Sequence, residues 1–174
     1  MIALVPIGEV EDTTVQSLAP PLAEILGQEV EIATTPLQPR GGWSRSRRQY
    51  LASALLALVP VPARGNRALR ITSADLYAPG LNFVFGIADT KGRRALISLA
   101  RLRPEFYGSP PDDTLFLERA VKEAVHELGH AYGLGHCRDP RCVMFFSNTL
   151  RDTDLKGPGF CAACREKVDL GISE

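Results

Sequence analysis

Apolar and polar residues alternate along the chain in patterns that predict strands and helices in turn. Short runs that are apolar throughout, or at every second position, predict strands, because a strand buries one face or both. The five strands expected are Ile2–Pro6, Glu29–Thr34, Ala68–Thr72, Leu81–Ala88 and Arg94–Leu102. Longer stretches with apolar residues three and four apart predict the helices Asp12–Gly27, Ser44–Val59 and Leu115–Tyr132.

Two of the predicted helices contain residues that bear on where they begin: a pair of prolines in the first and a capping serine in the second. The stretch Asp12–Gly27 contains Pro20 and Pro21. Proline lacks the backbone N–H and clashes with the preceding turn, so we expect the pair to break this helix or to mark its true start. In Ser44–Val59 we expect Ser44 to cap the first turn. Its expected apolar side consists of Tyr50, Leu51, Ala54, Leu55 and Leu58.

The last two predicted strands are joined by a turn sequence. Asp89-Thr90-Lys91-Gly92 suits a β-hairpin, so one strand of the pair must run antiparallel to its neighbour. An antiparallel strand at a sheet edge has free backbone groups to which an extended peptide can add as a further strand. Leu81–Ala88 is therefore either such a docking edge or an ordinary core strand.

The length and composition predict a single domain spanning residues 1–174. Hydrophobic residues make up 45% of the 174 residues, which is enough for a sizeable core. The apolar start Met1–Pro6 is too short, and has no basic residues before it, to be a secretory signal, and no apolar run approaches the roughly 20 residues that span a bilayer. We therefore expect a cytoplasmic protein without a membrane partner, and a monomer.

Charge is balanced overall but unevenly distributed. Between Arg40 and Arg103 there are twelve Lys or Arg and two Asp or Glu, whereas the rest of the chain has eight and eighteen. Either the two parts fold together and neutralise each other, or a basic patch lies beside an acidic one and attracts acidic peptides or nucleic acid.

All three histidines lie within residues 126–136. Four residues apart on a helix, His126 and His130 share one face, so both imidazoles can bind one ion. Gly133 can end the helix and bring His136 back as a third ligand. Three protein ligands leave the fourth position of a tetrahedral zinc open for water, and Glu127 stands where it can take a proton from that water. The short His-Glu-x-x-His pattern also occurs by chance, but the added glycine and third histidine favour the zinc site.

The four cysteines, all near the C-terminus, suggest a second zinc site. Cys137, Cys142, Cys161 and Cys164 form two pairs, C-x4-C and C-x2-C, separated by eighteen residues. The alternatives are disulfides or free thiols packed as small apolar groups, but paired thiols in a chain with no secretory signal favour structural zinc. Since Cys137 follows His136, this second metal would anchor the third ligand of the first. A lone methionine is more often core filler, but Met144 in a tight turn below the histidines would form a hydrophobic base for the metal.

These motifs together resemble the archaemetzincins, a family in the metzincin clan of zinc peptidases. The resemblance rests on His126-Glu127-x-x-His130-x-x-Gly133-x-x-His136-Cys137-x4-Cys142-x-Met144 followed by Cys161-x-x-Cys164, with a smaller contribution from Asn82-Phe83-Val84-Phe85-Gly86. It implies a metzincin-like zincin fold with a twisted mixed β-sheet, packed helices and an active-site helix. It also implies an N-terminal α/β subdomain, 1–133, and a small zinc-stapled C-terminal subdomain, 134–174.

The resemblance further implies a role for each motif residue. Catalytic zinc would be held by His126, His130 and His136, with Glu127 as the general base and Met144 in the Met-turn. A second, structural zinc would be held by Cys137, Cys142, Cys161 and Cys164. Some metzincins have a tyrosine two residues after the methionine as an extra metal ligand; this chain has Phe146 there, which cannot ligate.

We therefore hypothesise a zinc-dependent metallopeptidase that hydrolyses peptide bonds with two zinc ions per chain. The expected partner is a peptide or protein substrate, and nucleic acid is not expected. The rival hypothesis is a zinc-stabilised binding module, for nucleic acid or an acidic partner, whose first metal site is inert or empty. A zinc hydrolase acting on a non-peptide amide is a third reading of the same motif.

Overall fold

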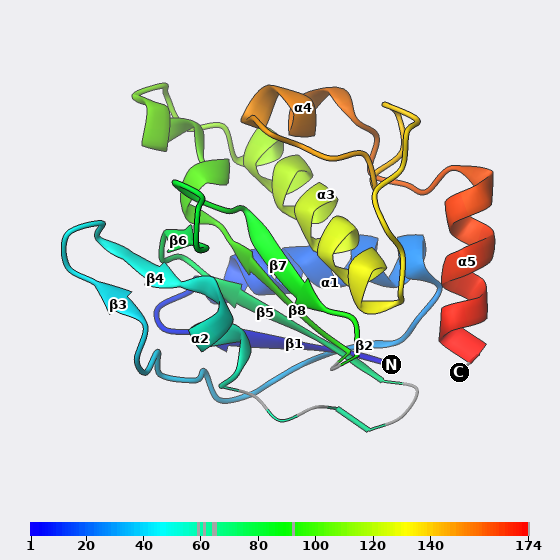
Figure 1. Ribbon diagram of the computed structural model, residues 1–174, viewed down its shortest axis with the longest axis horizontal. Coiled ribbons are helices and arrows are strands. Elements are labelled where there is room, and N and C mark those ends of the chain that lie inside the picture. Colours follow the sequence, from blue (N-terminus) through cyan, green and yellow to red (C-terminus); the bar gives the residue numbers. More distant parts are fainter. Residues whose placement is uncertain (59, 61, 64–65, 92, 174) are drawn as a thin grey trace.

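A twisted, mixed five-stranded β-sheet forms the centre of the molecule (Figure 1). The computed structural model describes residues 1–58, 60, 62–63, 66–91 and 93–173. The strands are β1 (Ile2–Ile7), β2 (Val30–Ile32), β5 (Arg67–Thr72), β7 (Gly86–Asp89) and β8 (Arg94–Ser98). Their order is β2-β1-β5-β8-β7, and every neighbouring pair is parallel except β7 and β8. The β7 strand therefore lies at one edge of the sheet and runs against its only neighbour.

Helices cover both faces of the sheet. The longest, α1 (Asp12–Leu26) and α3 (Asp113–Ala131), pack on one face through the main core. On the other face lie α2 (Ala52–Leu56) and a small sheet of order β3-β4-β6. The small sheet consists of β3 (Trp43–Ser44), β4 (Gln49–Leu51) and β6 (Leu76–Tyr77). The remaining elements are the 3-10 turns η1 (Ala100–Leu102) and η2 (Pro104–Tyr107) and the helices α4 (Leu150–Leu155) and α5 (Ala162–Ser173).

The structure contradicts the expected break at Pro20 and Pro21. Helix α1 begins at Asp12 and runs without interruption through both prolines to Leu26, and Gly27 follows in the left-handed conformation. The helix buries an apolar stripe formed by Val15, Leu18, Leu22 and Leu26. The prolines leave the carbonyl groups of Gln16 and Ser17 without donors, and both of these residues are exposed, so water can reach them. Burial of the stripe outweighs the lost hydrogen bonds.

The predicted helix Ser44–Val59 is wrong over its first half. Residues 43–51 form the antiparallel hairpin β3–β4, and helix begins only at Ala52; Val59 lies outside the described residues. Ser44 therefore caps nothing and pairs with Gln49 instead. The buried Gln49 amide donates to the Asp75 carboxylate and to two carbonyl oxygens. These long-range contacts override the local helical spacing.

The hairpin between the last two predicted strands is confirmed, but both strands are shorter than expected. β7 covers only the end of the predicted Leu81–Ala88 strand, because residues 81–85 form a loop. The predicted Arg94–Leu102 strand ends at Ser98, where the chain turns into η1. In the turn, Gly92 lies outside the described residues. The shortening of the first strand leaves the loop free to line the groove described below.

The central helix and the C-terminal segment share the main core. Helix α3 confirms the prediction, with Asp112 as its N-cap, and Gly133 at φ +96° turns the chain back. The side chains of Val143, Met144 and Val168 are fully buried in the same core as α1 and α3. The division into subdomains 1–133 and 134–174 stays a prediction. No helix within the described ranges has both the length and the apolar character needed to cross a bilayer.

Candidate metal centres and active-site groove

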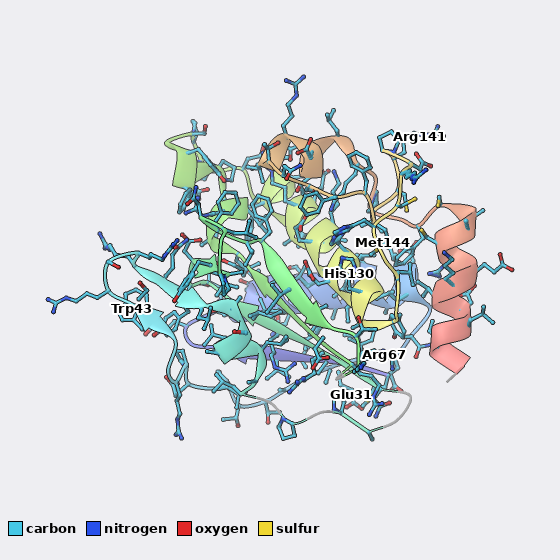
Figure 2. All side chains as sticks on the ribbon, in the orientation of Figure 1. Glu31, Trp43, Arg67, His130, Arg141 and Met144 are labelled. Atoms are coloured by element: carbon cyan, nitrogen blue, oxygen red, sulfur yellow. The ribbon has the colours of Figure 1, made fainter. Side chains whose placement is uncertain are left out.

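The three histidines converge at the C-terminal end of α3. His126 and His130 lie one turn apart on the helix, and the reversal at Gly133 returns His136 to the same point. One ring nitrogen from each lies within 4.8 Å of the other two. The Nε2 atoms of His126 and His130 are 3.1 Å apart. Figure 2 shows His130 at this end of the helix, close to Met144.

Backbone carbonyl groups fix the orientation of the two helical histidines. The Nδ1 atom of His126 lies 2.8 Å from the oxygen of Val143, and that of His130 lies 2.7 Å from the oxygen of Leu134. With Nδ1–H donating to a carbonyl, the lone pair of Nε2 points into the cluster, as metal ligation requires. Burial lowers the pKa of His126 to about 3, so this imidazole is neutral at physiological pH.

Glu127 is buried against the edge strand. A Cβ atom at Gly86 would lie 2.6 Å from the Cγ atom of Glu127 and 2.6 Å from the carbonyl oxygen of Leu96. Only glycine therefore lets β7 approach this carboxylate so closely. Burial, and then the charge of Glu123, raise the pKa of Glu127 well above its ordinary value.

A second buried carboxylate lies one turn before Glu127. Glu123 forms an ion pair with Lys156 at 3.0 Å and accepts a hydrogen bond from the Thr153 hydroxyl at 3.0 Å. All three side chains are buried, which ties α3 to α4 and the residue after it. The positive charge of Lys156 thus lies close to the histidines, and it contributes to lowering the pKa of each of them.

The histidines and Glu127 open onto a groove of about 500 Å³. One wall consists of the loop and strand from residue 81 to residue 88, including the edge strand β7. The other wall carries the residues after the Met144 turn, Phe146, Ser147 and Asn148. The Phe146 ring lies 4.7 Å from that of His136 and is half exposed. A groove with an unpaired strand edge along one wall suits an extended peptide.

Met144 lies beneath the histidine cluster, fully buried. Its side chain contacts Gly129, so any side chain at that helix position would clash with the methionine sulfur. Its carbonyl oxygen accepts a hydrogen bond from the Cys137 backbone at 2.9 Å. The turn around Met144 and the segment after His136 therefore support each other.

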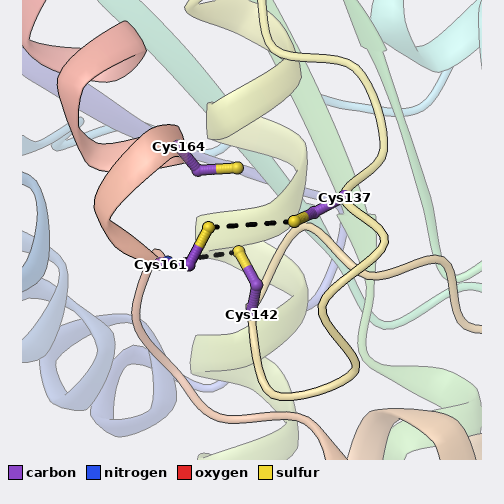
Figure 3. A group of neighbouring side chains, drawn as sticks. All are labelled: Cys137, Cys142, Cys161 and Cys164. Atoms are coloured by element: carbon purple, nitrogen blue, oxygen red, sulfur yellow. Dashed lines mark hydrogen bonds between the residues drawn. The ribbon is translucent and has the colours of Figure 1, made fainter.

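The four cysteines form a separate, closed cluster (Figure 3). Their sulfur atoms all lie within 4.8 Å of one another, and all four thiols are free. Cys137 and Cys161 approach to 3.8 Å, and the Cys161 backbone donates to the sulfur of Cys142 at 3.3 Å. Hydrogen bonding from the Cys164 backbone lowers the pKa of the Cys161 thiol, whereas burial raises the pKa values of Cys142 and Cys164. Four sulfur atoms at this separation suit the four ligands of a tetrahedral metal site.

Two features of the histidine site have no sequence signal, and a third has one that the sequence predictions did not use. Carbonyl groups such as those of Val143 and Leu134 carry no sequence signal, because any residue provides one. Lys156 lies in a stretch without a recognisable motif. Gly86 did have a signal, since an isolated glycine in a predicted strand marks a close approach of backbone.

Comparison with known sequences shows similarity along nearly the whole chain. The profile of peptidase family M54 matches residues 62–170. An archaemetzincin of Methanocaldococcus jannaschii is 45% identical over 172 residues, which cover 98% of this chain and 94% of that protein. An archaemetzincin of Pyrococcus furiosus is 44% identical over 178 residues, covering 97% and 92%.

Solved structures show the same fold. A zinc-dependent peptidase from Methanocorpusculum labreanum superposes with a TM-score of 0.87 at 32% identity, covering 97% of this chain and all of that one. An archaemetzincin from Archaeoglobus fulgidus, complexed with malonate, superposes with a TM-score of 0.84 at 39% identity, covering 96% and 99%. The shared fold therefore extends over nearly the whole chain.

Proposed function

This chain belongs to peptidase family M54, the family of the archaemetzincins, and is thus a zinc metallopeptidase; we propose that the histidine cluster is its catalytic centre. One observation carries the proposal. Three histidine nitrogens converge within 4.8 Å at the floor of a groove, and the carboxylate of Glu127 lines the same groove.

The histidine cluster fits a catalytic zinc ion by its chemistry and its access. Three imidazoles are a usual donor set for catalytic zinc, which keeps its fourth position for water or substrate. His126 and His130 are held by backbone carbonyls, so their orientation does not depend on the metal. His136 is exposed on the groove side, which leaves a route for substrate.

Glu127 acts in this proposal as the general base. When bound, zinc supplies Lewis acidity to the scissile carbonyl and the attacking water, and its positive charge opposes the rise in the pKa of Glu127 caused by burial. The carboxylate of Glu127 takes a proton from the water and then delivers it to the nitrogen of the leaving amine. Gly86 gives this carboxylate the space to face the substrate.

The peptide substrate that the family implies would lie along β7. As the antiparallel edge strand, β7 leaves one row of backbone groups unpaired on the groove side. An extended substrate that pairs with this row would be held with its backbone across the histidine cluster. A substrate paired with β7 at Gly86 would have its scissile bond within reach of Glu127, because Glu127 packs directly against Gly86.

The cysteine cluster would hold a second zinc that supports the first. Four cysteine ligands complete a tetrahedral zinc and leave no position for a substrate. Cys137 follows His136 directly, and Cys142 precedes the Val143 carbonyl that orients His126. The second ion would therefore fix two of the three histidines through the backbone.

Digestion of a peptide library tests the proposed function. The zinc-loaded chain should cleave peptides, a chelator should stop the cleavage, and added zinc should restore it. A matched library of non-peptide amides serves as the control for the third hypothesis. Absence of peptide cleavage by chain that carries two zinc ions would refute the proposal.

A further inference from the structure

The β3–β4 hairpin carries a concentration of positive charge that the proposed chemistry does not use. Residues 43–50 are here called the basic hairpin. Its three arginines, Arg45, Arg47 and Arg48, are all exposed. Within the described part of the chain, no carboxylate forms a salt bridge with any of the three. The hairpin projects at one end of the molecule, marked by Trp43 in Figure 2.

The basic hairpin is attached to the wall of the active-site groove. The Arg47 guanidinium donates to the carbonyl oxygen of Leu81 at 3.4 Å and lies 4.8 Å from the centre of the Tyr77 ring. Leu81 lines the groove and is 53% exposed. Gln49 donates a second hydrogen bond to this loop, at the carbonyl oxygen of Asn82. The hairpin is therefore a continuation of the wall that carries β7.

Within the described residues, the acidic group that contacts the hairpin is already paired with another cation. The closest acidic residue in its contacts, Asp75, forms an ion pair with Arg101 at 2.8 Å. Of the two carboxylates that line the groove, Glu123 is paired with Lys156 and Glu127 is buried against Gly86. A ligand in the groove thus meets net positive charge at the hairpin end.

We propose that the basic hairpin is a specificity subsite that binds acidic side chains of the peptide substrate; this proposal rests on the proposed peptidase function. Gly86, which contacts Glu127, and Leu81, which contacts Arg47, are five residues apart in the sequence. Because an extended chain spans at most about 3.6 Å per residue, a substrate needs no more than about five residues to run from the scissile bond to the hairpin. Exposed Arg–carboxylate pairs are individually weak, so several pairs together would produce a preference of about tenfold.

Two peptides that differ only in charge test the proposal. One peptide carries glutamate, and the other glutamine, at the four or five positions at one end of the peptide. The comparison is made first for the N-terminal side of the scissile bond and then for the C-terminal side. We expect kcat/KM at low salt to be about tenfold higher for the glutamate peptide on one side, and the difference to shrink at high salt. Equal kcat/KM for the two peptides on both sides would overturn the proposal.

Variants assign the preference to the hairpin. Arg45→Gln combined with Arg48→Gln removes two charges that make no contact with the groove wall, and Arg47→Gln tests the third separately. Each should reduce the preference, and the double variant should also leave kcat/KM for the glutamine peptide unchanged. Arg151→Gln combined with Lys167→Gln removes the same charge from exposed sites outside the groove and should keep the preference. Persistence of the preference in both hairpin variants would overturn the assignment.

Two further measurements separate this proposal from its alternatives. Failure to cleave either peptide would refute the peptidase function; binding of the same two peptides, followed by fluorescence anisotropy, then tests the hairpin independently. In that assay the glutamate peptide should bind about tenfold tighter, and equal binding would refute the subsite. Stronger competition by a short single-stranded RNA than by the glutamate peptide would assign the hairpin to nucleic acid instead.

Discussion

The histidine cluster and the cysteine cluster are both groups of possible metal ligands, but only the histidine cluster lines the groove. Both bring their ligand atoms within 4.8 Å of one another. The histidines provide three nitrogens at the floor of a groove, whereas the cysteines provide four sulfur atoms away from it. The number of protein ligands and the neighbouring groove, rather than the ability to bind metal, distinguish a reactive site from a supporting one.

The two clusters are joined through a short stretch of backbone. His136 and Cys137 are neighbours in the sequence, and the Cys137 backbone donates to the carbonyl of Met144. Val143 accepts the hydrogen bond that orients His126, and its own N–H donates to Gly159 at 2.9 Å, near Cys161. A change in either cluster should therefore reach the other, because coupling between two binding sites is reciprocal.

The largest expected effect is on catalysis at the open site. Glu127→Gln keeps the size of the side chain but removes the base, so cleavage should fall about 10²- to 10⁴-fold while two zinc ions remain bound. Steady-state kinetics and metal analysis on the same sample measure both quantities. The control is Glu118→Gln, an exposed position on the same helix, which should retain full activity. Unchanged turnover in the Glu127 variant would remove this residue from the mechanism.

The next effect concerns stability at the closed site. Cys142→Ala leaves three sulfur ligands around a buried position and should lower the free energy of unfolding by about 4 kcal/mol, because a structural zinc site contributes folding energy. His136→Ala should abolish cleavage but change the free energy of unfolding much less. Denaturant titration of both variants gives the comparison. Equal losses of stability would contradict the division into a reactive and a supporting site.

A smaller loss of stability is expected from the buried ion pair beside the histidines. Lys156→Met leaves the Glu123 carboxylate buried without its partner and should lower the free energy of unfolding by about 3 kcal/mol. Combining it with Glu123→Gln removes the second charge and should recover most of that loss. If the double variant is no more stable than the single one, the pair does not act as a unit.

Acid should destabilise the histidine site when a mild chelator has emptied it. Burial lowers the pKa of His126 to about 3 in the folded chain, against an ordinary value of 6.5, so the unfolded state binds a proton first as the pH falls. Stability is therefore lost between pH 6.5 and about pH 3, and by pH 5 the loss should be about 2 kcal/mol. Denaturant titrations at pH 7 and pH 5 measure it, with His126→Gln as the control that should reduce the difference.

The smallest effect is expected from the contact between β7 and Glu127. Gly86→Ala places a methyl group against the Glu127 side chain and the Leu96 carbonyl, and should lower kcat about tenfold with zinc content unchanged. Gly135→Ala is the matched control, because no atom lies within 4 Å of its added methyl group. Full activity of the Gly86 variant would show that Glu127 does not need this close approach.

Local sequence patterns predicted the elements whose contacts are local or strongly periodic. Helix α3 and its end at Gly133 follow from apolar spacing and from the conformational freedom of glycine. The clustering of the histidines and of the cysteines was also predicted, because short spacings on one helix and in two pairs restrict where the side chains can lie. What each cluster binds and does remains part of the proposal.

Patterns failed where distant residues decide the local structure. The β3–β4 hairpin replaces a predicted helix because Gln49 bonds to residues 75, 76 and 82, which no local spacing reveals. Helix α1 continues through Pro20 and Pro21 because its opposite face is buried in the core. The partnership of Glu123 with Lys156 spans 33 positions and likewise has no sequence signal.

Anomalous diffraction at the zinc edge from crystals of the zinc-loaded chain tests the central claim most directly. We expect two peaks per chain, one inside the four sulfur atoms and one bound by His126, His130 and His136 with a fourth ligand that is not part of the protein and faces the groove. A single peak at the cysteines, or a protein side chain in that fourth position, would contradict the account.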